Sequence, residues 1–249
     1  MARKAIGIDI GGTGIKGALV DTKNGELLSS RIKMETPSGG EPEAIAEVVG
    51  EIVSELTNRS DRNIGICFPA VVQDGITRSA ANVSKRWIDL DAQALFSSLL
   101  HTRVEMLNDA DAAGFAESLF GAGKGKRGLV IMTTLGTGIG TALIYNGVLV
   151  PNSELGHLAI DGVDYETKAS FAAKERDGLS FEQWAERLQK YYSELERLFS
   201  PSLFIVGGGV SKSHKEFLPL LRLKTPIVPA KLKNSAGIIG AATLANRNF

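Results

Sequence analysis

One short pattern occurs twice in this chain and constrains its fold more than any other feature. The stretch Gly12–Ile15 (GTGI) returns 124 residues later as Gly136–Ile139, and an Ala-Leu pair follows each copy at the same spacing. Each copy reads as strand, glycine turn, strand, and is followed by an Asn-Gly pair that turns the chain again. Six matches at one offset predict two related halves, each of which opens with the same hairpin.

The order of the remaining segments predicts the fold class. Strand-like apolar runs alternate with helical patterns, which is typical of an α/β architecture. A length of 249 residues is enough for two modest domains with their own cores. We expect a small N-terminal domain of residues 1–108 plus the C-terminal helix 236–249, and a larger domain of residues 109–235. The expected helices span residues 41–57, 110–120, 181–199 and 236–247.

The composition excludes several classes of function. Basic and acidic residues number 28 each, so no net charge attracts nucleic acid or an anionic membrane. Cys67 is the only cysteine, which excludes a disulfide framework and a zinc site made of several cysteines. The apolar stretches are too short for a signal peptide or a membrane span. We therefore expect a cytoplasmic protein without a nucleic-acid or membrane partner.

The glycine turns of the two hairpins are suited to binding phosphate. Several free backbone N–H groups without Cβ atoms form a concave anion site, and Thr13 and Thr137 add hydroxyl donors. A Rossmann fingerprint is excluded because residues 16–21 alternate like a strand, where that motif needs a helix. Neither GGTGIKGA nor GAGKGKRG supplies the Gly-Lys-Ser/Thr of a Walker A loop. Two tight hairpins without a ligand remain the alternative.

One carboxylate breaks the symmetry of the repeat. Asp9 stands just before the first glycine turn, whereas its counterpart before the second turn is Thr133. A single carboxylate beside two phosphate turns suits Mg²⁺, which commonly takes one or two protein carboxylates, waters and substrate phosphates. A strand-end Asp that caps its own turn is the alternative.

Five motifs follow one another along nearly the whole chain: DIGGTGIKGALVD, LNDADAAG, LGTGIGTALI, ELGHL and VGGGVS. Together they resemble the ROK sugar kinases of the actin-like ATPase superfamily, and most closely its actinobacterial polyphosphate glucokinases. The resemblance implies a two-domain actin-like (ribonuclease H-like) ATPase fold with a deep interdomain cleft. It also implies Mg²⁺-dependent transfer of a phosphoryl group from inorganic polyphosphate or ATP to the 6-hydroxyl of glucose, and of mannose as well. A homodimer is compatible with it.

The resemblance also implies roles for particular residues. Asp109 matches the catalytic base, and Asp9 would hold Mg²⁺ through water. The residues that would bind the sugar are Asn82, Asn108, Asp109, Glu154, His157 and Glu166. The residues that would bind the phosphate donor are Gly11, Gly12, Thr13, Gly14, Lys16, Gly136, Thr137, Gly138, Gly208 and Gly209.

The residues themselves leave part of this interpretation open. Asn108 and Asp109 could simply cap the helix that follows them. Glu154 and His157 are three residues apart, so on a helical turn they would share a face and reach neighbouring hydroxyls. Many ROK proteins carry a cysteine-rich zinc motif after ELGH, but the interval LAIDGVDY contains no cysteine, so we expect no zinc.

Three other functions remain alternatives. An ATP-only ROK glucokinase would share the same motifs. A sugar-sensing ROK regulator would carry a DNA-binding domain before the first hairpin, where this sequence has five residues before Ile6. An actin-like ATPase without a sugar substrate would have no need of the ELGH motif.

A basic loop precedes the second hairpin. The stretch GAGKGKRG places Lys124, Lys126 and Arg127 among glycines. Since polyphosphate is a repeating anion, fixed positive charge along its path would favour it over ATP. A solvated loop between helix and strand is an equally good interpretation.

Overall fold

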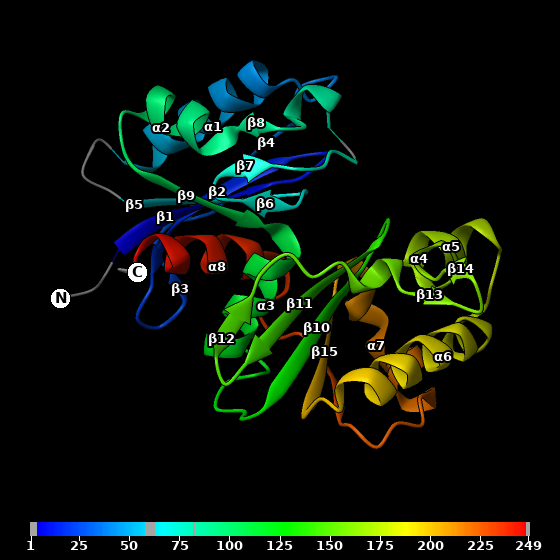
Figure 1. The fold of residues 1–249 in the computed structure, drawn as a ribbon. Coiled ribbons are helices and arrows are strands. Elements are labelled where there is room, and N and C mark those ends of the chain that lie inside the picture. Colours follow the sequence, from blue (N-terminus) through cyan, green and yellow to red (C-terminus); the bar gives the residue numbers. More distant parts are fainter. Residues whose placement is uncertain (1–3, 58–62, 82, 248–249) are drawn as a thin grey trace. The chain divides into compact units, whose positions relative to one another are not determined.

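The chain folds into two compact units. The structure, a computed structural model, describes residues 4–57, 63–81 and 83–247. The first unit comprises residues 1–116 and 234–249, and the second comprises residues 117–233. Residues 109–116 and 234–235, which the predicted bounds gave to the second domain, belong to the first unit. Figure 1 shows the elements of both units.

A mixed sheet forms the centre of the first unit. Its hairpin strands β1 and β2 are antiparallel, and β1, β5 and β9 run parallel to one another. The strand order is β3-β2-β1-β5-β9, with β4 also paired to β2. The strands are β1 Lys4–Ile10, β2 Ile15–Asp21, β3 Glu26–Leu27, β4 Ile32–Met34, β5 Asn63–Phe68 and β9 Val104–Asn108.

The second unit repeats this sheet. Its order is β12-β11-β10-β15-β16, in which β10 and β11 form the antiparallel hairpin and β10, β15 and β16 run parallel. Two halves with the same hairpin and the same parallel extension confirm the repeat predicted from the glycine pattern. The strands are β10 Leu129–Leu135, β11 Ile139–Tyr145, β12 Val148–Val150, β15 Leu203–Gly207 and β16 Ile227–Pro229.

The two faces of β1 differ because its residues alternate. Ile6, Ile8 and Ile10 point to one face and are fully buried, whereas Gly7 and Asp9 point to the other. Large apolar side chains therefore fill one side of the first sheet, and small or polar residues lie on the opposite side.

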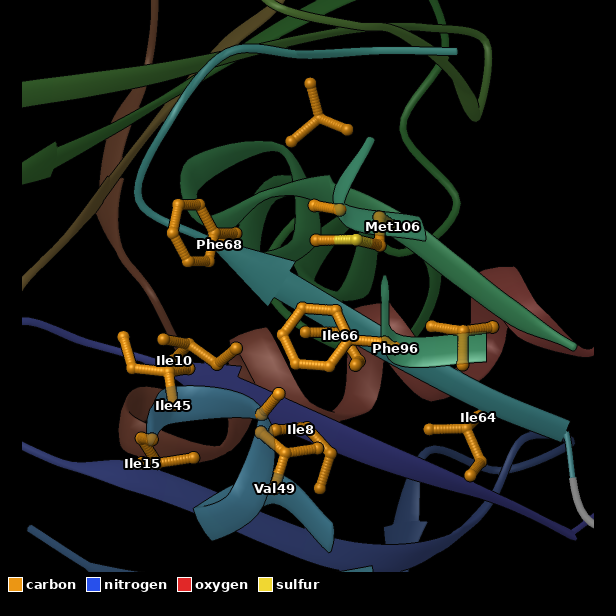
Figure 2. Close-up of a cluster of buried hydrophobic side chains, with 14 of the residues drawn as sticks. Ile8, Ile10, Ile15, Ile45, Val49, Ile64, Ile66, Phe68, Phe96 and Met106 are labelled. Carbon is orange, nitrogen blue, oxygen red and sulfur yellow. The ribbon is translucent and has the colours of Figure 1, made fainter. Parts of the chain in front are cut away.

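Two helices cover the isoleucine face of the first sheet. They are α1 (Pro42–Leu56) and α2 (Ala92–Leu100). Figure 2 shows Ile45 and Val49 of α1 and Phe96 of α2 among the isoleucines of the strands. The helical spacing of apolar residues in α1 predicted this helix and its buried face. Each such side chain contributes about 1.5–3 kcal/mol when it is fully buried.

The opposite face of the sheet receives α8 (Ala236–Ala245) at very short range. A Cβ atom at Gly7 would lie 1.9 Å from a carbonyl oxygen of α8, and one at Gly65 would lie equally close to another. A Cβ atom at Gly240 of α8 would lie 1.9 Å from a carbonyl oxygen of α3 (Asp109–Phe120). Glycine is required at these positions because backbone meets backbone there.

The core of the second unit is aromatic. The long helix α6 (Phe181–Phe199) begins with a capping box formed by Ser180 and Gln183. It buries Trp184, Tyr191 and other large side chains against the sheet. Among the described residues, none of the helices has both the length and the apolar content needed to cross a bilayer.

Shorter elements complete the two units. The first unit also contains β6 Val72–Gln73, β7 Ile76–Thr77, η1 Lys85–Trp87 and β8 Leu90–Asp91. The second unit also contains η2 Leu155–His157, β13 Ala159–Ile160, β14 Val163–Asp164, α4 Glu166–Ala169, α5 Phe171–Arg176, η3 Gly209–Ser213, α7 His214–Phe217 and η4 Leu218–Leu220. The turn η5 Lys233–Ser235 leads into α8.

Candidate active site

The first glycine turn closes the hairpin of β1 and β2. The amide of Gly11 donates to the carbonyl of Gly14 over 3.1 Å, and the hydroxyl of Thr36 donates to the carbonyl of Gly11 over 2.5 Å. Gly12 and Thr13 are exposed at its tip. The turn is therefore held in shape from behind while its tip stays open to a ligand, as a phosphate cradle needs.

Asp9 lies at the base of this turn with two partners. Its Oδ2 atom lies 3.3 Å from the Nζ atom of Lys16, and the two side chains are 20% and 31% exposed. Its Oδ1 atom accepts from the thiol of Cys67 over 3.6 Å, because Asp9 and Cys67 stand opposite each other in the parallel pair of β1 and β5. A Cβ atom at Gly237 of α8 would lie 3.3 Å from the carboxyl carbon of Asp9. Lys16 and Cys67 thus hold the carboxylate of Asp9, and the backbone of α8 passes close to it.

The buried thiol of Cys67 feels the charges of both Asp9 and Asp109. Burial raises the pKa of Cys67 well above its usual range, and the negative charges of Asp9 and then Asp109 raise it further. Cys67 therefore stays an uncharged thiol that can donate to Asp9. Asp9, expected to bind the metal, and Asp109, expected to act as the base, thus both lie within electrostatic range of this sulfur atom.

Asn108 and Asp109 stand where β9 passes into α3. The side-chain oxygen of Asn108 accepts from the amides of Ala110 and Asp111 over 2.8 and 3.1 Å, and its amide nitrogen donates to Ala70 over 3.1 Å. One carboxylate oxygen of Asp109 also accepts from the amide of Ala110, over 2.8 Å. The helix-cap interpretation is confirmed for Asn108. The helix N-terminus also favours the ionised form of Asp109.

The second glycine turn is tighter than the first. The amide of Gly136 donates to the carbonyl of Gly138 over 3.0 Å, and the carbonyl of Gly136 accepts from Ala172. Thr137 is exposed at the tip. At the position that matches Asp9, Thr133 is fully buried and hydrogen-bonds the hydroxyl of Tyr192 over 2.6 Å. At this strand position, therefore, only the first hairpin carries a carboxylate.

Glu166 lies directly against the second turn. Its Oε2 atom accepts from the amide of Ile139 over 2.7 Å. A Cβ atom at Gly138 would lie 2.5 Å from that same oxygen, so glycine at this position leaves room for the carboxylate. The sequence offered no sign of this contact, because the two residues are far apart in the chain and share no pattern.

Glu154 precedes a single 3-10 turn, η2, and His157 is the last residue of that turn. A 3-10 helix has three residues per turn, so residues three apart lie on the same side, as expected from their spacing. The turn packs closely on β11, where a Cβ atom at Gly156 would lie 2.1 Å from the carbonyl oxygen of Ile139. Partial burial raises the pKa of Glu154, His157 opposes this shift, and the charge of Glu166 adds to it. Glu154, His157 and Glu166 therefore form one electrostatic group.

Asp164 is a member of this group that the sequence analysis missed. Its Oδ2 atom lies 2.8 Å from Nδ1 of His157, and its Oδ1 atom accepts from the amide of Glu166 over 3.2 Å. The hydrogen bond to Asp164 is the main cause of a raised pKa at His157. The Asp-Gly pair at 161–162 could have revealed Asp164, because such a pair favours a tight hairpin turn, and in the structure both residues have the positive φ angles of that turn. That turn folds β14 back beside β13.

The GGG motif lies beside the second turn. Gly208 has a φ of 83° and a Cβ atom there would lie 2.3 Å from the carbonyl oxygen of Leu135, the last residue of β10. Gly209 faces open space. Asn82, which was also predicted to contact the sugar, lies outside the described residues. Within residues 4–57, 63–81 and 83–247, no group of three or more His, Cys, Asp or Glu side chains could hold a metal ion.

Comparison with known proteins identifies the relatives of this chain. Residues 5–173 of this chain match the sequence model of the ROK family. The chain belongs to the ROK family. A polyphosphate glucokinase of Mycobacterium tuberculosis (strain CDC 1551 / Oshkosh) is 44% identical over 241 residues, which cover 96% of this chain and 90% of the relative.

Two solved ROK structures are similar over almost the whole chain. The inorganic polyphosphate/ATP-glucomannokinase of Arthrobacter sp. strain KM is 55% identical with a TM-score of 0.92, covering 97% of this chain and 98% of that one. A ROK family glucokinase of Streptomyces griseus, in complex with glucose and AMPPNP, is 27% identical with a TM-score of 0.82. The match covers 98% of this chain and 100% of that one. The predicted fold class is thereby confirmed, since ROK sugar kinases have the two-domain actin-like fold.

Proposed function

We propose that this ROK protein is a polyphosphate/ATP-dependent glucokinase, which transfers a phosphoryl group from inorganic polyphosphate or ATP to the 6-hydroxyl of glucose. The observation that carries the proposal is the end-to-end similarity, at 55% identity, to a polyphosphate/ATP-glucomannokinase. The 44% identical relative is likewise named for polyphosphate and glucose. An ATP-only kinase and a sugar-sensing regulator are not favoured.

Asp109 is the proposed catalytic base. Phosphoryl transfer to a hydroxyl needs a carboxylate that accepts the hydroxyl proton and holds the oxygen in line with the donor. Asp109 is the first residue of α3, and its bond to the amide of Ala110 fixes the orientation of the carboxylate. Its position at a helix N-terminus keeps it ionised and ready to accept that proton.

The proposed sugar contacts come from the group around η2. Glu154 can accept hydrogen bonds from sugar hydroxyls, and His157 can donate or accept one through Nε2. Glu166 offers its second carboxylate oxygen while Oε2 is held by the amide of Ile139. Asn108 and Asn82 are proposed as further sugar contacts.

The two glycine turns are the proposed cradle for the donor phosphates. Residues 11–14 and 136–138 offer backbone amides and the hydroxyls of their threonines, and Lys16 adds a positive charge. Gly208 and Gly209 would lie against the rest of the donor.

A divalent metal is part of the proposed chemistry, and Mg²⁺ fits the donor set. The oxygens of Asp9 are ligands of the type that Mg²⁺ prefers, and Lys16 holds one of them at 3.3 Å. A metal held there would neutralise charge on the donor phosphates, and Lys16 would supply a further positive charge beside them.

The proposal extends to partners and location. Mannose is a second proposed acceptor, because the 55% identical relative is named a glucomannokinase. We expect no nucleic-acid or membrane partner, a cytoplasmic location and a possible homodimeric assembly, all of which stay predictions from the sequence.

A coupled assay for glucose 6-phosphate tests the proposed function. Purified protein, Mg²⁺ and glucose are incubated separately with ATP and with long-chain polyphosphate. We expect product with both donors, and mannose 6-phosphate when mannose replaces glucose. 6-Deoxyglucose is the matched control, because it lacks the accepting hydroxyl and should give no product. Absence of sugar phosphate with every donor would overturn the proposal.

A further inference from the structure

A hollow on the second unit lies apart from the candidate active-site residues. It has a volume of about 560 Å³. Its walls come from the end of α3, the basic loop before β10, and the turn between β11 and β12. The lining residues are Ser118, Leu119, Gly125, Lys126, Arg127, Asn146 and Gly147. The lining thus contains two cations, no carboxylate and no aromatic side chain.

The two cations of this hollow are available to a ligand. Lys126 and Arg127 are exposed, and across the described parts of the chain neither forms an ion pair. Other basic residues of the same unit behave differently: Arg176 pairs with Asp177 and Arg197 pairs with Glu194. Positive charge is therefore left uncompensated at the hollow, while it is neutralised at these other positions.

Two hydrogen bonds join the loops that form the hollow. Gly125 and Gly147 have φ angles of 75° and 81°, which favour glycine. Asn146, in the turn after β11, joins this turn to the basic loop. Its Oδ1 atom accepts from the backbone amide of Gly128 over 2.8 Å, and its backbone amide donates to the carbonyl of Gly128 over 3.1 Å. These bonds tie the basic loop to the turn between β11 and β12, which lowers the entropic cost of ordering the two on binding.

The hollow lies at the far end of a hairpin from the proposed phosphate cradle. In β10 and β11, Leu129 pairs with Tyr145 beside the hollow, and Leu135 pairs with Ile139 beside the turn 136–138. Figure 1 shows these two long strands side by side. Seven residues of strand span roughly 20 Å. A ligand that reaches both ends must therefore be much longer than a triphosphate.

We propose that this hollow, through Lys126 and Arg127, binds distal phosphates of a long inorganic polyphosphate whose reacting end lies at the glycine turns. The inference rests on the proposed function. A flexible polyanion without bases suits a lining that has cations and amides but no aromatic surface for stacking. Lys124 belongs to the same loop and is exposed, but it does not line the hollow. Of the three basic residues that the sequence suggested as a track, two thus define the site.

Lys124 provides a matched control for the test. The variants Lys126→Ser and Lys124→Ser remove the same charge from the same loop, and the double variant Lys126→Ser/Arg127→Ser removes both proposed contacts. Binding of long-chain polyphosphate is measured at equilibrium without sugar, and KM is measured for long-chain polyphosphate, tripolyphosphate and ATP. Melting temperatures check that each variant is folded.

We expect Lys126→Ser to raise Kd and KM for long-chain polyphosphate about two- to fivefold, the size typical of an exposed ion pair. The double variant should raise them further and weaken their salt dependence. Tripolyphosphate and ATP should respond little in any variant, and Lys124→Ser should resemble the wild type.

Three results would overturn the assignment of the hollow. Equal effects of Lys124→Ser and Lys126→Ser would indicate general attraction by the loop. Equal effects on short and long donors, or none in the double variant, would mean that the chain does not reach the hollow. If the wild type phosphorylates no glucose from polyphosphate of any length, the proposed function itself fails on that donor. The two kinds of failure can be told apart, because the wild-type assay alone tests the proposed function, whereas the assignment of the hollow is tested by comparing the variants.

Discussion

The Nδ1 atom of His157 lies 2.8 Å from Oδ2 of Asp164, with the two side chains 54% and 44% exposed. Because the carboxylate accepts from Nδ1–H, the pair fixes the orientation of the imidazole ring and leaves Nε2 for a ligand. Asp164 also accepts from the amide of Glu166. One carboxylate of the β13–β14 hairpin thus positions two of the proposed sugar-binding residues.

The variant Asp164→Asn should lower the pKa of His157, because it removes the negative charge and the charged hydrogen bond that raise it. It should also raise the KM for glucose more than it changes kcat. NMR titration of the ring measures the pKa. Asp161→Asn is the control, since Asp161 lies on the same hairpin but pairs with Lys190. An unchanged His157 titration in Asp164→Asn would show that the pair does not act in solution.

The same pair has a defined pH dependence. A raised pKa means that folding favours the imidazolium form. The stabilisation is therefore fully present below the ordinary pKa of about 6.5 and is lost as pH rises through the raised value. Since both side chains are about half exposed, solvent screens the pair and its effect on unfolding is small.

Backbone contact between α8 and the first sheet should make Gly65 intolerant of any side chain. Gly65→Ala places a Cβ atom 1.9 Å from a carbonyl oxygen of α8, and such overpacking typically costs about 1–3 kcal/mol of unfolding free energy or more. Gly50→Ala is the control: it lies in α1 with its nearest neighbour at 3.6 Å and should be neutral or stabilising by up to about 1 kcal/mol. Urea unfolding measures both. Equal stability of the two variants would contradict the packing described.

The protein should contain no stoichiometric zinc. The interval after ELGH has no cysteine, so the cysteine ligands that such a zinc motif would supply are missing. Elemental analysis of washed protein measures the metal, and activity with Mg²⁺ should survive a zinc-selective chelator. One zinc per chain would refute this expectation.

Asp9→Asn should raise the Mg²⁺ concentration needed for half-maximal activity, because it removes the charge proposed to hold the metal. EDTA should abolish activity, and excess Mg²⁺ should restore it in the wild type. Cys67→Ala serves for comparison, since it keeps the Asp9 charge and removes only its thiol donor. If Asp9→Asn requires no more Mg²⁺ than the wild type, the metal is held elsewhere.

Local signals made much of the fold predictable. The repeat of GTGI predicted both hairpins, and the spacing of Ile45, Val49 and their neighbours predicted α1. Contacts that depend on register or on distant loops left no such signal. Asp9 meets Cys67 only because β1 and β5 pair in parallel, and Glu166 reaches the amide of Ile139 across 27 residues of chain. The Asp161-Gly162 turn could have revealed Asp164, because Asp-Gly favours a tight hairpin.

The variant Asp109→Asn tests most directly the claim that this chain is a sugar kinase with its base at the start of α3. Asparagine keeps the size and the bond to the amide of Ala110 but cannot accept the hydroxyl proton. With glucose, Mg²⁺ and either donor, kcat should fall on the order of 10²- to 10⁴-fold, while calorimetry should show glucose binding close to that of the wild type. Near-normal turnover by folded Asp109→Asn protein would contradict the account.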